Sequence, residues 1–329
     1  MSIIKTAAEL TVPTTIKILI YGTYGSGKTT LGLSASRPIM FDFDDSARRL
    51  NERHQEQGAF VECRPDPTDN RKSWNEIMDL IERTPHELDP FDTIVVDTIG
   101  KMIDAIIYRC CGNRQPYVQE WRDINQEFKR FVKGVALLGK NLVFIAHSAS
   151  KEIKKKKGNE MYFYPDIREK SYAAIATDFD LIGFLQMETD DSGRQVRSLA
   201  FDPTSHNDGK NTCEMPTLDV PVVIQNGQEV AKNDFLQREV FTRFFDYQQG
   251  KVNRAKEYKD LLTEIDDAVN LITDEVGAND FMKRVLVNKG FKHVGTSLQK
   301  ARELFAAKVK ELGLTYNKET QKYEKNAKK

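Results

Sequence analysis

One segment of the sequence decides how the rest is interpreted: Gly22-Thr23-Tyr24-Gly25-Ser26-Gly27-Lys28-Thr29. It matches the pattern G-x-x-x-x-G-K-[ST] in full. Glycine allows positive φ angles and a close backbone approach, so peptide N–H groups can turn inward around a phosphate. The apolar run Ile16–Tyr21 before it and the helical pattern Lys28–Ser36 after it supply the strand and helix that such a loop needs. We expect this segment and the adjoining Thr30 to bind the phosphates of a nucleotide.

The end of this segment suits a triphosphate and its metal ion. Lys28 is expected to reach the β- and γ-phosphates, and the Thr29 hydroxyl to bind Mg²⁺. A second metal ligand is expected from the apolar run that starts at Phe91 and ends in Asp97. Asp97 would bind Mg²⁺ through water, because ligands collect at the carboxyl ends of parallel strands. The alternative is that Asp97 caps the helix that begins near Gly100.

The first half of the chain alternates short apolar runs with longer amphipathic ones. The runs predicted to be strands are Ile16–Tyr21, Pro38–Phe43, Ala59–Cys63, Thr93–Asp97 and Asn141–His147. The segments predicted to be helices are Lys28–Ser36, Asp45–Gln57, Lys72–Arg83, Gly100–Cys111 and Tyr117–Leu138. This alternation predicts an α/β fold, with a mostly parallel sheet and helices on both of its faces.

The second half differs in pattern. Asp180–Met187 and Arg194–Phe201 predict a β-hairpin added to the sheet, Val220–Ile224 a last strand and Asp234–Tyr247 a helix. Only helices are expected further on, at Val252–Glu275, Asp280–Asn288 and Ser297–Leu312. We therefore divide the chain into a core at 1–248, a small helical module at 249–313 and a flexible basic tail at 314–329.

Composition narrows the class of protein. The 329 residues include 49 Lys and Arg and 49 Asp and Glu, so the net charge is zero and any polyanion must meet a local patch. No apolar run approaches the roughly 18 residues of a membrane helix, and Met1–Val12 lacks the pattern of a signal peptide. The four cysteines form no CxxC pair. We expect a cytoplasmic protein without a membrane partner.

Further polar residues follow the predicted strands. Asp42, Asp44 and Asp45 form a carboxylate cluster after the second strand, and His147 ends the fifth. An ATPase needs a carboxylate that orients the attacking water and a polar group that senses the γ-phosphate. The guanine-reading pattern Asn-Lys-x-Asp is missing from the sequence, so ATP is expected rather than GTP.

In this order of elements the chain resembles the RecA-like P-loop ATPases, and most closely the phage-encoded ones associated with single-strand annealing and recombination. The resemblance covers roughly residues 14–225. It places Gly22–Thr29 at the Walker A position and Asp97 at the Walker B position. It implies that Asp44 activates water, with Asp42 or Asp45 as alternatives, and that His147 is the γ-phosphate sensor.

The segment 148–171 is basic and aromatic, and we predict a loop there. It holds Lys151, Tyr162 and the run Lys154, Lys155, Lys156 and Lys157. Sites for single-stranded DNA combine cations along the backbone with aromatic faces on which bases stack. The resemblance also puts a DNA-binding loop at this place. The alternative is a solvated charge run whose aromatic residues pack on the domain.

Two cations at the end of this loop suggest assembly. Arg168 and Lys170 are candidates for a trans-acting contact, in which a neighbouring subunit completes the site of a ring or filament. Arg194 and Arg197 on the predicted hairpin are further candidates. The competing explanation is a surface ion pair with Asp166 or Glu169. A homo-oligomer is otherwise implied only by the resemblance.

The function expected from the sequence is ATP hydrolysis coupled to single-stranded DNA. ATP and Mg²⁺ would be bound, and DNA would stimulate the hydrolysis. The resemblance implies phage recombination or annealing in a bacterial host cytoplasm, with a phage recombination or replication protein as a partner. Two alternatives stay open: a nucleotide-switched ATPase that binds a protein partner, and a helicase-type DNA motor.

Overall fold

The computed structural model describes residues 3–155, 158–191, 193, 195–225, 227–287 and 292–325. The chain divides into two compact units. One comprises Pro13–Asp246, and the other comprises Met1–Val12 together with Tyr247–Lys329. The division between them falls within one long helix, α7 (Thr242–Asn270).

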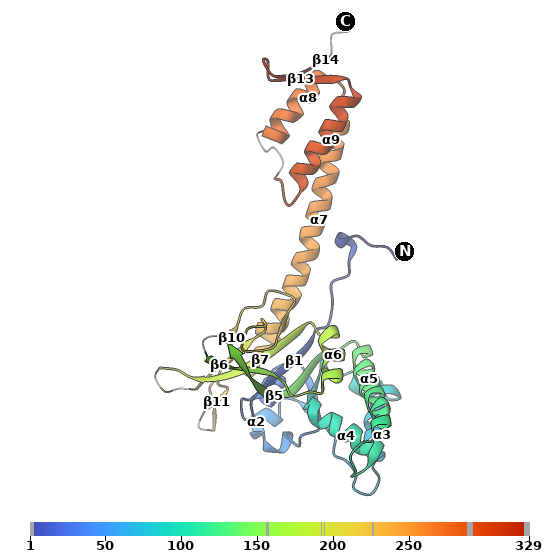
Figure 1. Ribbon diagram of the computed structural model, residues 1–329, viewed down its shortest axis with the longest axis vertical. Coiled ribbons are helices and arrows are strands. Elements are labelled where there is room, and N and C mark those ends of the chain that lie inside the picture. The colour runs from blue at the N-terminus through green and yellow to red at the C-terminus, as the bar shows by residue number, and fades with distance from the viewer. Residues whose placement is uncertain are drawn as a thin grey trace. The chain divides into compact units, whose positions relative to one another are not determined.

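The larger unit is built on one sheet whose strands run in the order β3–β2–β4–β5–β1–β7–β8–β10 (Figure 1). The six strands from β3 to β7 are parallel where they pair, and the later additions are antiparallel. Their bounds are β1 Lys17–Gly22, β2 Pro38–Asp42, β3 Ala59–Glu62, β4 Thr93–Asp97, β5 Asn141–Lys155, β7 Leu181–Thr189, β8 Gln195–Ala200 and β10 Leu218–Asp219. The expected RecA-like α/β core with its added hairpin, β7–β8, is confirmed.

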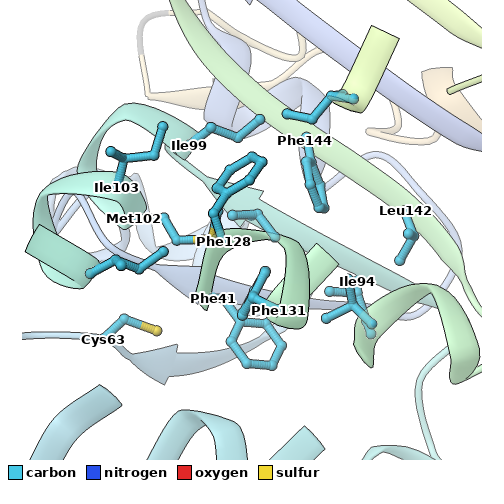
Figure 2. Packing of buried hydrophobic residues seen from close by; sticks show 14 of the residues in the cluster. Phe41, Cys63, Ile94, Ile99, Met102, Ile103, Phe128, Phe131, Leu142 and Phe144 are labelled. Atoms are coloured by element: carbon cyan, nitrogen blue, oxygen red, sulfur yellow. The ribbon is translucent and has the colours of Figure 1, made fainter. Parts of the chain in front are cut away.

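Both faces of the sheet are covered, because its central strands alternate two sets of apolar side chains. One face packs against α3 (Lys72–Glu82), α4 (Ile99–Cys111), α5 (Trp121–Leu137) and α6 (Glu169–Asp178). Figure 2 shows this layer, in which Phe128 and Phe131 of α5 meet Phe41 and Phe144 of the sheet. On the other face, α1 (Lys28–Gly32) lies so close that a Cβ at Gly32 would meet Val95 at 2.9 Å.

Several predicted elements differ in length. The helix expected over 45–57 is a 3-10 turn, Ala47–Arg49, followed by the single turn α2 (Glu52–Gln55). The residues expected to begin this helix form a turn instead, because the Asp42 carboxylate accepts hydrogen bonds from the backbone N–H groups of Ser46 and Ala47. The prediction of a strand at 220–224 is also wrong. β10 ends before this segment, and among the described strands β11 (Ile224–Gln225) pairs with β12 (Gln228–Glu229) alone.

The basic segment is not an irregular loop. β5 continues past His147 to Lys155 and pairs antiparallel with β6 (Gly158–Pro165), from Ser148↔Pro165 to Lys155↔Gly158. We call this pair the β5–β6 ribbon. β-Propensity explains the difference, since Met161–Tyr164 are residues that favour strands and the lysine run of the facing strand conceals its pattern. Phe163 anchors the ribbon by stacking on Phe184 of β7, with ring centroids 5.3 Å apart.

The smaller unit is mainly helical. It contains α7, α8 (Glu275–Phe281), a π-helical segment at Met282–Val287 and α9 (Ser297–Glu311). Its core holds Ile265, Phe281 and Phe305, which are buried. Where the sequence predicts a flexible tail, β13 (Leu314–Asn317) and β14 (Lys322–Lys325) form a hairpin. Tyr323 packs edge-on against Phe305, which explains why this stretch is ordered.

Candidate functional site

The glycine-rich loop joins β1 to α1. Gly25 and Gly27 have φ angles of 75° and 91°, in the region that favours glycine. The Lys28 ammonium folds against the loop and donates to the carbonyl oxygens of Gly22 and Thr23, at 2.9 and 2.6 Å. An ammonium has three donors, so one remains for an anion in front of the loop.

Asp97 lies at the end of β4, directly beside α1. Its Oδ2 accepts hydrogen bonds from the hydroxyls of Thr29 at 2.6 Å and Ser46 at 2.9 Å. The alternative role as a helix cap is wrong, because Thr98 caps α4 by accepting a hydrogen bond from the Lys101 N–H. Asp97 is buried, and its carboxylate and the Thr29 hydroxyl are adjacent oxygen ligands of the kind that Mg²⁺ prefers.

A cavity of about 360 Å³ opens between the loop and the ends of β2, β4 and β5. Lys28, Thr29, Asp44, Asp97 and His147 all line it, so residues expected to act together from sequence lie in one place. The cavity is lined by Tyr24, Gly25, Gly27, Thr30, Ser46, Arg49 and Leu50 as well.

The three carboxylates after β2 have different surroundings. Asp42 is buried and bonds the following turn through Ser46 and Ala47. Asp45 is half exposed and pairs with Arg48 and Arg64. Of the three, Asp44 alone lines the cavity, where its carboxylate accepts from Arg49 at 3.0 Å. The geometry therefore favours Asp44 as the carboxylate next to a bound nucleotide.

His147 stands where β5 leaves the sheet for the ribbon. Its Nδ1 is buried, and no group in the described part of the chain forms a hydrogen bond with it, an arrangement that costs free energy. Burial lowers the pKa of His147, and the nearby Lys28 charge lowers it further. The imidazole is therefore neutral near pH 7 and able to accept or donate one hydrogen bond within the cavity.

Burial also sets the charges at the loop. It lowers the pKa of Lys28 from 10.5 to about 8, although Asp97 and Asp44 act in the opposite direction. Burial raises the pKa of Asp97, against hydrogen bonds from Thr29 and Ser46. The site thus holds a buried cation, Lys28, and a buried anion, Asp97. A phosphate beside Lys28 and a divalent cation beside Asp97 would each supply the opposite charge.

These residues fit a nucleoside triphosphate with Mg²⁺. The fit rests on the third ammonium donor of Lys28 and on the adjacent oxygen atoms of Thr29 and Asp97, which line the same cavity. Thr29 and Asp97 are the residues suited to hold the metal.

Sequence reasoning missed two side chains of this site. Ser46 donates to Asp97, and Arg49 holds Asp44 through both its carboxylate and its carbonyl oxygen. Both lie on the turn after β2, whose path no spacing pattern indicates. The prediction of a continuous helix there concealed them.

One face of the ribbon carries Lys151 together with two tyrosine rings. Lys151 is paired with Tyr162, and its ammonium lies 5.3 Å from the Tyr162 ring centroid and 5.5 Å from that of Tyr164. Lys154 is exposed on the same strand. Lys155 and Gly158 form the last residue pair of the ribbon. Lys156 and Lys157 lie outside the described residues. Cations and stackable rings thus occur together, as a single-strand site requires.

The two trans-acting candidates have neighbours within the chain. The Arg168 guanidinium carbon lies 3.2 Å above the centroid of the Trp121 ring, so its first contact is a cation–π stack rather than an acid. Lys170 is exposed and lines a cavity with Arg122 and Lys129.

Fold and loop together define a RecA-like P-loop ATPase, a nucleotide-binding class. A family model described as AAA domain (AAA_24) matches residues 14–213, and the chain belongs to this family. The match ends within the larger unit. Among curated proteins, none matches this chain.

Solved structures with low sequence identity resemble the chain in part. The KaiC-like protein PH0186 from Pyrococcus horikoshii OT3 has 14% identity and a TM-score of 0.34, over 56% of this chain and 76% of that one. The flagellar accessory protein FlaH from Methanocaldococcus jannaschii has 14% identity and a TM-score of 0.34, over 57% and 78%. The RadB recombinase has 16% identity and a TM-score of 0.33, over 56% and 79%.

In the described ranges of the chain, none of the helices combines the length and apolar character needed to cross a bilayer.

Proposed function

We propose that this chain hydrolyses ATP and acts on single-stranded DNA in phage recombination or annealing. The observation that carries the proposal is the continuity of β5. This one strand passes His147 at the nucleotide cavity and becomes the first strand of the basic, aromatic ribbon. β5 therefore joins the nucleotide cavity to the ribbon through one continuous backbone.

The nucleotide half of the proposal assigns each residue of the cavity a task. Lys28 and the backbone of Gly22–Thr30 bind the triphosphate, while Thr29 and Asp97 hold Mg²⁺. The metal supplies positive charge that offsets the charge developing on the phosphates. Asp44, held by Arg49, orients the attacking water, and His147, which lines the same cavity, contacts the γ-phosphate.

In the DNA half of the proposal, the β5–β6 ribbon binds the single strand. Lys151 and Lys154–Lys157 track the phosphate backbone, and Tyr162 offers a face for stacking, worth about 1–3 kcal/mol per base. Function in a ring or filament of identical subunits, with Arg168 or Lys170 reaching a neighbouring site, belongs to the same proposal. So do a phage recombination or replication protein as partner and the bacterial host cytoplasm as location.

Binding to labelled oligonucleotides tests the DNA half. The full chain, with ATP and Mg²⁺, should bind single strands with an affinity that rises with strand length and should bind duplex more weakly. Strand unwinding would instead indicate a motor. Indifference to every DNA would leave an ATPase that switches a protein partner.

A further inference from the structure

A second cavity, of about 300 Å³, adjoins the phosphate-binding loop on its other side. It shares Gly25, Gly27 and Thr30 with the first cavity, so the two lie next to each other along the loop. Its walls are mixed in polarity: Leu31, Phe235 and the segment from Val220 to Ile224 supply apolar surface, and Gln195 and Asn233 supply polar groups. A volume near 300 Å³ is at the lower end of the range for small-molecule sites.

Arg197 of β8 stands between this cavity and the loop. The sheet register aligns Gly22 with Leu185 and Leu185 with Leu199, and Arg197 lies two residues before Leu199, on the same face. Its Nη1 would be 2.5 Å from a Cβ at Gly27. The guanidinium therefore packs directly on the loop, beside Gly27.

The charge of Arg197 is uncompensated. Across the described residues, it pairs with no carboxylate, and its Nη2 donates to the Pro221 carbonyl oxygen at 2.6 Å. By contrast, Arg37, Arg49 and Arg130 each meet an acid. Burial alone lowers the pKa of Arg197. A half-buried guanidinium with most of its five donors unused is suited to a bidentate anion such as phosphate.

We propose that Arg197 binds, within the same chain, the nucleotide phosphate nearest the ribose, and that the Val220–Ile224 wall receives the base. The terminal phosphates belong beside Lys28 and Asp97 in the first cavity, so the other end of the nucleotide passes Gly27 and Thr30 into the second. The hydrogen bond from Arg197 to the Pro221 carbonyl oxygen links the residue that contacts the phosphate to the wall that receives the base. This inference rests on the nucleotide binding proposed above and deepens it.

Calorimetry tests the proposed phosphate contact and base wall. It measures the binding of a non-hydrolysable ATP analogue and of inorganic tripolyphosphate to the full chain. Arg197→Met keeps the length of the side chain and removes its charge. We expect this variant to bind both ligands roughly tenfold to a hundredfold more weakly, which corresponds to the loss of one charged hydrogen bond. Arg130→Met is the matched control, since Arg130 pairs with Glu82 at the surface, and it should leave both affinities unchanged. Val222→Gln should lower the affinity for the ATP analogue and leave the affinity for tripolyphosphate unchanged.

The outcomes are distinct. Equal affinities in Arg197→Met and the unaltered chain would overturn the inference, given a thermal melt that shows both folded. A loss confined to the ATP analogue would also overturn the phosphate contact, because Arg197 would then only support the wall through Pro221. If the unaltered chain bound neither ligand, the proposed nucleotide function itself would fail.

Discussion

Tyr24 and His147 stack with their ring centroids 4.1 Å apart and their planes inclined by 30°. Tyr24 belongs to the phosphate-binding loop, and His147 to the strand that leads into the ribbon. The pair is thus a direct contact between the two halves of the proposed function. Aromatic stacking of this kind stabilises by about 0.5–1.5 kcal/mol, enough to link small movements of the two rings.

Replacing Tyr24 should therefore weaken the coupling. Tyr24→Leu removes the stack, and we expect the ratio of ATP hydrolysis with single-stranded DNA to hydrolysis without it to fall several-fold. Tyr24→Phe keeps the ring and should keep the ratio. Steady-state hydrolysis of both variants measures this, and an unaltered ratio in Tyr24→Leu would show that the contact transmits nothing.

The carboxylates after β2 allow a matched comparison. Asp44→Asn should lower ATP hydrolysis by roughly a hundredfold or more while ATP still binds, because an amide cannot accept a proton from water. Asp45→Asn should hydrolyse ATP at close to the original rate, since Asp45 pairs with Arg48 and Arg64 outside the cavity. Single-turnover measurements distinguish the two. The reverse order of effects would move the role from Asp44 to Asp45.

Nucleotide affinity should depend on pH through Lys28. With its pKa near 8, the ammonium is charged below that pH and neutral above it. Affinity for a non-hydrolysable ATP analogue should therefore fall above pH 8, by up to about tenfold per pH unit. The free protein should show the opposite trend: an unfolded lysine keeps its proton up to about pH 10.5, so stability rises between pH 8 and 10.5.

Lys28→Ala supplies the control for this titration. It should abolish nucleotide binding or reduce it to a weak, pH-independent level. A variant that bound and hydrolysed ATP like the original chain would remove the site assignment. A constant affinity of the unaltered chain from pH 7 to 9.5 would show that Lys28 does not titrate there.

The ribbon should determine the salt dependence of DNA binding. Replacing Lys151 and Lys154–Lys157 by glutamine should weaken binding to single strands and flatten the plot of log affinity against log salt concentration. Each lost phosphate contact changes the slope by about 0.7, because fewer counterions are released. Lys72→Gln is the control, since Lys72 pairs with Asp66 elsewhere. An identical slope in the ribbon variant would place the DNA site elsewhere.

Much of the core follows from the sequence because its signals are local. The glycine-rich loop and the apolar runs around it predict the strands β1 to β4, the start of β5 and the added hairpin to within a few residues. The β5–β6 ribbon and the β13–β14 hairpin escape prediction, since lysine-rich stretches become strands only through their pairing and through anchors such as Phe163 and Tyr323.

The candidate site shows the same division. Lys28, Thr29 and Asp97 stand out from their motifs, and the structure brings them together. Sequence could not choose among Asp42, Asp44 and Asp45, because the direction of each depends on the turn that follows β2. Arg197 reaches the loop only by virtue of the register between β1, β7 and β8, which no spacing along the chain reveals.

The most direct test of the central claim is ATP hydrolysis by the purified full chain, with and without single-stranded DNA, at two salt concentrations. We predict a clear stimulation by DNA that weakens at the higher salt, because the ribbon binds the phosphate backbone and β5 carries the effect to His147. Hydrolysis that proceeds at one rate, whatever the DNA and salt, would contradict the coupling and leave only a partner-switching ATPase.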